Sequence, residues 1–161
     1  MYTLSGALAS PYSQKLRAIL RYRRITHIWA HGAAAQAATA KVKAPVIPVL
    51  EFPDGTFAND TTPLIYELEK RHTQRSIIPE NQGHAFLAHL IEDFADEWLT
   101  KAMFGYRWLD EVDQKQMSEW LAFDAFKGGG EQAAAHATTF RDRQGGRMVL
   151  VGRSPEDFPL N

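Results

Sequence analysis

The chain has 161 residues, of which 45% are hydrophobic and 23% charged, a balance typical of a folded globular protein rather than a disordered one. The formal net charge of −1 gives no reason to expect nucleic acid or an anionic membrane as a partner. The absence of cysteine excludes a disulfide framework, a thiolate metal site and a cysteine nucleophile. No apolar stretch approaches the roughly 20 residues of a membrane helix, and the first residues do not resemble a secretion signal, so we expect a cytoplasmic protein.

The first forty residues predict alternating strands and helices. Residues 2–5 are β-prone and precede a glycine, which is typical of a short strand followed by a loop. Ser10 and Pro11 predict a helix start, with the serine as N-cap and the proline in the first turn. Residues 26–30 suit a second strand. The alanine-rich run 33–40 suits a helix, which we expect to be exposed and mobile because it lacks a bulky apolar stripe.

Residues 46–52 carry the strongest strand signal of the chain, and a turn at 53–55 leads to a returning strand at 56–58, which predicts a β-hairpin. Pro48 lies inside the first strand, where a proline removes a hydrogen-bond donor from the ladder. A cis peptide between Ile47 and Pro48 would resolve this conflict, and a trans proline at a bulge is the alternative.

A third helix follows the hairpin, with Thr61 or Thr62 as its cap and Pro63 in its first turn. The resulting order is β-α-β-α-β-β-α over about 75 residues, which predicts a mixed sheet covered by helices.

The second half of the chain is predicted to be entirely helical, with the change of character near residues 76–83. A helical pattern runs from about 82 to 108, and its large apolar residues share one side. Residues 113–126 predict a second helix, which three consecutive glycines interrupt, and residues 131–136 begin one more.

Four segments, taken in order, resemble the glutathione transferase family. The sequence Ser-Pro-Tyr-Ser at 10–13 is similar to the Ser-Pro-aromatic triplet of the serine-type enzymes and to the Cys-Pro-Tyr-Cys of glutaredoxins. The sequence Val-Ile-Pro-Val-Leu at 46–50 resembles the family's Val-Pro-Val-Leu, whose proline is cis. Asn-Asp-Thr at 59–61 resembles the Glu-Ser or Asp-Ser pair, and residues 90–108 resemble the first helix of the family's helical domain.

The resemblance implies an α/β thioredoxin-like domain of βαβαββα order at residues 1–78 and an all-α transferase domain at residues 83–161. A full helical domain of this family needs about twice the chain that follows residue 82, so we expect the helical part to be incomplete. An incomplete core would leave apolar helix faces exposed and favour dimerisation or instability.

The resemblance also implies a role for each site residue, with glutathione as the ligand. Ser10 would stabilise the glutathione thiolate, and the main chain of Ile47, before Pro48, would pair with the cysteinyl part. Asp60 and Thr61 would hold the γ-glutamyl end. From the residues alone, Ser10 can equally be a plain N-cap, and the pair 60–61 a plain helix cap. The contact to the glycyl carboxylate stays unassigned.

The assignment of Ser10 has a physical basis. A free thiol has a pKa of about 8.5, so little thiolate forms at neutral pH. A helix N-terminus favours an anion by about 0.3–1 kcal/mol, and a hydroxyl donating to a charged acceptor adds about 1.5–3 kcal/mol. Because about 1.4 kcal/mol corresponds to one pKa unit, the two effects together can bring the thiol close to neutrality.

Three aromatic residues of the helical half, Trp98, Tyr106 and Trp108, are of a kind that usually packs in a core. The resemblance implies that one of them lines an apolar pocket for the acceptor substrate, with Tyr106 and Trp108 as the candidates. The carboxylates at 92–97 lack a histidine at the spacing of a metal site, and we interpret them as a solvated helix face that binds no metal.

The function implied is conjugation of glutathione to a small apolar electrophile by a homodimeric enzyme. The alternative is a non-catalytic transferase-like module that binds a protein partner. Reduction by a glutaredoxin-like mechanism is disfavoured, because the chain has no thiol of its own.

Overall fold

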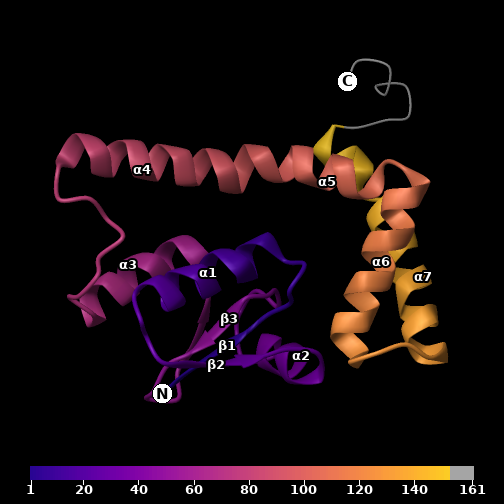
Figure 1. Cartoon of the computed structure of the whole chain (residues 1–161), viewed down its shortest axis with the longest axis horizontal. Helices are drawn as coiled ribbons and strands as arrows, with labels where there is room; N and C mark the ends of the chain where they lie inside the picture. The colour runs from indigo at the N-terminus through magenta and orange to yellow at the C-terminus, as the bar shows by residue number, and fades with distance from the viewer. Residues whose placement is uncertain (153–161) are drawn as a thin grey trace. The chain divides into compact units, whose positions relative to one another are not determined.

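The structure is a computed structural model that describes residues 1–152 (Figure 1). The chain divides into two compact units, Met1–Ala85 and Phe86–Asn161. Among the described residues, no helix has both the length and the apolar character needed to cross a membrane.

The first unit is a four-stranded mixed sheet with helical cover. Its elements, in chain order, are β1 (Tyr2–Ser5), α1 (Pro11–Tyr22), β2 (His27–Ala30), α2 (Ala33–Thr39), β3 (Val49–Glu51), β4 (Phe57–Asn59) and α3 (Thr61–Arg71). The strand order is β2-β1-β3-β4, with β1 parallel to β2 and the other two pairings antiparallel. This arrangement confirms the thioredoxin-like fold class.

The core of this unit lies between the sheet and helices α1 and α3, which pack against each other over one face of it (Figure 1). The helices turn their apolar stripes inward because their apolar residues recur at a spacing of three to four. The buried cluster consists of Tyr2, Leu4, Leu16, Leu20, Ile25, Leu50, Phe52, Leu64 and Leu68.

Helix α2 buries one face, whereas the sequence suggested that the whole helix is exposed; residues 33, 34, 36 and 37 are exposed. Ala35, Ala38 and Thr39 are buried, with 5%, 9% and 5% of their surfaces accessible, and the helix packs against β1 and β3. Small side chains allow the backbone of the helix to approach the sheet closely, so the lack of a bulky apolar stripe did not prevent burial.

Two boundaries around the hairpin differ from the sequence prediction. The strand expected over 46–52 is regular only at Val49–Glu51, and the Ile47–Pro48 peptide that precedes it is cis, as expected. The cap of α3 is Asp60, not a threonine: its carboxylate accepts a hydrogen bond from the Thr62 N–H at 3.3 Å. The aspartate takes this role because its side chain reaches the N–H two residues on.

The second unit is helical. It begins within α4 (Gln82–Phe94) and continues with the π-helical turn η1 (Ala95–Leu99), α5 (Thr100–Trp108), α6 (Glu111–Phe126), α7 (Glu131–Gly145) and the 3-10 turn η2 (Met148–Val151). Helices α6 and α7 pack together through Ala122, Ala133 and Ala137. The helix expected to begin at 131 therefore extends well beyond 136.

The apolar side of the first long helix is exposed. The helix predicted over 82–108 is interrupted by η1, and no residue of α4 or η1 is buried. Seven large side chains there are 50–66% accessible, and we call them the α4 face: Phe86, Leu87, Leu90, Ile91, Phe94, Trp98 and Leu99.

Candidate functional site

Strand register gathers the candidate residues at one end of the sheet. Val49, the first residue of β3, pairs with Ser5 at the end of β1 and with Asn59 at the end of β4. The loop that follows β1, the segment that precedes β3 and the start of the helix after β4 therefore leave the sheet at the same end. These three segments contain Ser10, Ile47 with Pro48, and Asp60 with Thr61.

Ser10 is the N-cap of α1, with an extended backbone at φ −85° and ψ 118°. Its hydroxyl oxygen accepts a hydrogen bond from the Ser13 N–H at 3.2 Å, and Pro11 occupies the first helical position. A hydroxyl has one donor and two acceptor sites, so the half-buried Ser10 can cap the helix and still donate its proton to a ligand. The cap and the ligand-binding interpretations are compatible.

The loop before Ser10 is closely packed on α1, and Gly6 makes this packing feasible. A Cβ at Gly6 would meet the Ser13 Oγ at 2.6 Å and the Trp29 ring at 2.9 Å. Ser13 is fully buried, and its Oγ accepts from the Ala7 N–H at 3.4 Å. The sequence marked Gly6 only as a loop residue, because the steric requirement depends on how α1 and β2 pack around it in the fold.

The segment before β3 presents main-chain groups without partners. Pro48 is buried and Ile47 is half-buried. Within residues 1–152, neither the N–H nor the C=O of Ile47 makes a hydrogen bond. Buried or half-buried main-chain groups are nearly always paired, so an unpaired donor and acceptor on one residue are suited to an extended ligand strand.

The start of α3 offers a second set of polar groups. Asp60 has φ 74° and ψ 113°, a backbone conformation that costs a non-glycine residue about 1–3 kcal/mol and that concentrates at functional sites. Thr61 is only 3% accessible, and in the described part of the chain its N–H and hydroxyl have no hydrogen-bond partner. A helix N-terminus of this kind binds carboxylates, because its first N–H groups are free of intrahelical bonds.

Asn59 belongs to the segment 59–61 noted in the sequence, but the sequence assigned it no role of its own. Its side-chain Nδ2 donates to the Ala44 carbonyl at 2.6 Å and lies 3.4 Å from the Val46 carbonyl. The amide thereby ties the segment immediately before Ile47 to the end of β4. No local signal in the sequence indicates this contact, which joins residues 15 positions apart.

The opposite end of the sheet has a different character. A hollow of about 550 Å³ lies there, lined in part by Tyr2, Arg23, Arg24 and His72. It is formed by the ends of α1 and α3 and by the hairpin turn, and it contains none of the five candidate residues.

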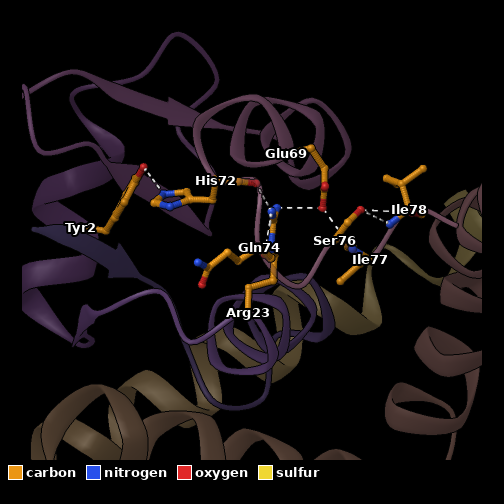
Figure 2. A network of polar contacts seen from close by, with 8 residues as sticks. All are labelled: Tyr2, Arg23, Glu69, His72, Gln74, Ser76, Ile77 and Ile78. Atoms are coloured by element: carbon orange, nitrogen blue, oxygen red, sulfur yellow. Dashed lines mark hydrogen bonds and ion pairs between the residues drawn. The ribbon is translucent and has the colours of Figure 1, made fainter. Parts of the chain in front are cut away.

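A buried arginine organises this end (Figure 2). Arg23 is 4% accessible, and its Nη1 lies 2.7 Å from the Glu69 Oε1 as an ion pair without the alignment of a hydrogen bond. Its Nη2 donates to the carbonyls of His72 and Gln74, while the Ile77 N–H donates to Glu69 at 3.1 Å. Residues 72–78, which follow α3, are therefore anchored to the ends of α1 and α3.

His72 completes this network through its ring. The His72 Nε2 lies 2.9 Å from the Tyr2 hydroxyl. A dashed line marks this contact in Figure 2. Burial, followed by the charges of Arg23 and Arg71, lowers the pKa of His72 below its ordinary value. Burial raises the pKa of Tyr2. Both groups are thus held in their neutral forms.

The aromatic candidates lie in the helical unit. Trp108 is 3% accessible and packs on Phe140 at a centroid distance of 5.7 Å, whereas Tyr106 is 68% accessible. Trp98, expected in a core, is 62% accessible. No group of three potential metal ligands occurs among the residues that the structure describes.

Comparison with known proteins finds one match in the first unit. Residues 4–76 match the family model of the glutathione S-transferase N-terminal domain. A search of curated proteins finds no match.

Solved structures of similar fold include glutathione S-transferases. That from Methylobacterium radiotolerans, in complex with glutathione sulfonate, is 17% identical with a TM-score of 0.59, over 96% of this chain and 88% of that one. That from Rhodospirillum rubrum is 17% identical with a TM-score of 0.60, over 89% of this chain and 63% of that one. That from Methylobacillus flagellatus, with glutathione bound, is 21% identical with a TM-score of 0.53, over 93% of this chain and 69% of that one.

Proposed function

We propose that this protein is a serine-type glutathione transferase that joins the sulfur of glutathione to a small apolar electrophile. The observation that carries the proposal is one end of the sheet, to which the segments with Ser10, with the unpaired main chain of Ile47 and with Thr61 lead. The match of residues 4–76 to the transferase N-terminal domain supports it, as do neighbours of the same fold that were solved with glutathione bound.

The cysteinyl and γ-glutamyl parts of glutathione have complementary groups at this end of the sheet. The Ile47 N–H and C=O pair with the cysteinyl main chain in the manner of an added strand. The Thr61 N–H and hydroxyl, at the start of α3, hold the γ-glutamyl carboxylate. The exposed Asp60 carboxylate faces the γ-glutamyl ammonium and contributes opposite charge.

Ser10 acts on the sulfur. The glutathione thiol loses its proton to solvent, and the Ser10 hydroxyl donates a hydrogen bond to the resulting thiolate at the N-terminus of α1. The thiolate then attacks the electrophilic carbon, a carbon–sulfur bond forms, and the leaving group departs with the bonding electron pair. Ser10 stays uncharged throughout and is not the nucleophile.

Of the two aromatic candidates for the acceptor pocket, the exposed Tyr106 can meet a ligand without a change in its packing. Trp108 is enclosed by its own unit, between Phe104 and Phe140. We therefore keep Tyr106 as the candidate for the acceptor pocket and assign Trp108 to the core of the helical unit.

Calorimetric titration with glutathione tests the proposal. We expect micromolar-to-millimolar binding that Thr61→Val weakens about tenfold or more, since a hydrogen bond to a charged group contributes about 1.5–3 kcal/mol. Thr39→Val is the matched control, because Thr39 is equally buried but its hydroxyl donates to the Gln36 carbonyl at 2.7 Å. The ultraviolet absorbance of the thiolate, followed against pH, reports the pKa of bound glutathione. In Ser10→Ala this pKa should rise by about one unit or more.

A folded chain that does not bind glutathione would defeat the proposal. The protein would then be the non-catalytic interaction module, in which the same fold binds a protein partner. Binding that Thr61→Val and Thr39→Val weaken equally would leave glutathione as ligand but remove the assigned γ-glutamyl contact.

A further inference from the structure

Asn59 has a fixed orientation at the edge of the proposed glutathione site. Its main chain belongs to β4 and pairs with Val49, the residue that follows Pro48. Its side-chain nitrogen lies 2.6 Å from the Ala44 oxygen and 3.4 Å from the Val46 oxygen. Both neighbours are carbonyl oxygens, which only accept hydrogen bonds, so the amide nitrogen must face them.

The segment that Asn59 contacts has little other support. Residues 44–46 are exposed and lie outside any strand, and Val46 is 59% accessible. Within residues 1–152, their backbone makes one hydrogen bond to another backbone group, from the Val46 N–H to the Ala44 carbonyl at 2.8 Å. Within residues 1–152, Asn59 supplies the side-chain hydrogen bonds that join this segment to the sheet.

Asn59 therefore holds the chain on both sides of the cis proline. Its backbone fixes Val49 after Pro48, and its side chain fixes Ala44 and Val46 before Ile47. The peptide groups of Ile47 lie between these two fixed points and have no other hydrogen bond to orient them in the described chain.

From this geometry we propose that Asn59 is a positioning residue for glutathione. It acts through the main chain of Ile47, whose N–H and C=O it orients toward the ligand. The inference rests on the proposed function, because it assigns a ligand to the Ile47 main chain. A group that orients the ligand equally in the ground and transition states changes affinity and leaves turnover unchanged.

The test compares Asn59→Ala and Asn59→Asp with wild type. Alanine removes the donor, and aspartate keeps the shape but places a carboxylate against two carbonyl oxygens. We expect the glutathione Kd to rise about three- to tenfold in the alanine variant and at least as much in the aspartate variant. With a chlorodinitrobenzene as acceptor, KM for glutathione should rise in parallel while kcat stays within about twofold of wild type.

Gln114→Glu is the matched control. The Gln114 Nε2 donates to the Trp108 carbonyl at 2.8 Å and lies 3.4 Å from the Leu109 carbonyl, the same pattern in the helical unit. This variant should lower Tm as Asn59→Asp does but leave the glutathione Kd unchanged.

An Asn59→Asp protein with lowered Tm and unchanged Kd would overturn the inference and make Asn59 a structural residue only. A fall in kcat with unchanged KM would overturn it as well. If wild type itself fails to bind glutathione, the proposed function fails first, and the two failures are thereby distinguished.

Discussion

His72 links the end of α3 to the first strand through its contact with the Tyr2 hydroxyl. Burial, Arg23 and Arg71 lower its pKa in the folded protein, so the unfolded chain binds the proton more readily. The folded state is therefore stabilised above the unfolded pKa of about 6.5, and this contribution is lost as the pH falls through the lower folded value. We expect thermal stability to decrease between about pH 7 and about pH 5.

The variant His72→Gln isolates this effect. Glutamine does not titrate, and its amide can still reach the Tyr2 hydroxyl, so Tm should depend less on pH over the same window than in wild type. His84→Gln, which replaces an exposed histidine on α4, is the control and should retain the wild-type dependence. Equal pH profiles for His72→Gln and wild type would show that His72 does not titrate with folding.

At the scale of single residues, the sequence revealed those whose roles are local. Ser10 and Pro11 are recognisable because a serine cap followed by proline acts within one helical turn. Asn59 was not recognisable, because its partners are the carbonyls of another segment, and any residue type can supply a carbonyl. Asp60 was recognised both as a ligand candidate and, with Thr61, as a helix cap, but its positive φ depends on how β4 enters α3.

At the scale of elements, one cation holds together the ends of α1 and α3 and residues 72–78. Arg23 is buried with Glu69, whose side chain is 16% accessible, and it satisfies two carbonyls of the segment that leaves α3. Arg23→Met leaves a largely buried carboxylate unpaired, so we expect a loss of about 3–5 kcal/mol in the free energy of unfolding. Urea denaturation followed by circular dichroism measures it.

Three further variants show whether the buried ion pair is responsible. Arg23→Lys keeps the charge without the planar fork and should be intermediate, and it remains measurable if Arg23→Met does not fold. Arg71→Met, which removes an exposed partner of Glu67, should cost at most about 1 kcal/mol. Combining Arg23→Met with Glu69→Leu should recover part of the loss. Equal costs at Arg23 and Arg71 would contradict this account.

The starts of helices were easier to predict from the sequence than the packing of the helices against other segments. The starts of α1 and α3 follow from capping residues and apolar spacing, which are local properties. The burial of α2 was missed because alanine carries no signal of its own, and its fate depends on how closely the sheet approaches. The anchoring of residues 72–78 was missed because its partner, Arg23, lies 49 positions from His72.

At the scale of the whole molecule, the sequence predicted an α/β part followed by an all-α part. Residues 4–76, within the α/β part, match the model of the glutathione S-transferase N-terminal domain. The apolar period of α4 predicted a helix correctly, but periodicity does not say what covers an apolar side. The α4 face consists of seven large apolar residues, each of which is at least half accessible.

We expect a second copy of the chain to cover the α4 face. Contiguous apolar patches of this kind are rare on monomers and typical of protein–protein interfaces. Sedimentation velocity over about a hundredfold range of protein concentration should show a monomer–dimer equilibrium, because association follows mass action.

Leu90→Glu combined with Phe94→Glu places two charges one helical turn apart on this face and should give a monomer at every concentration. Val112→Glu changes an apolar residue of α6 that is 73% accessible and does not belong to the α4 face, and it should leave the dimer intact. A wild-type chain that stays monomeric throughout would contradict self-association and leave the face for a different partner.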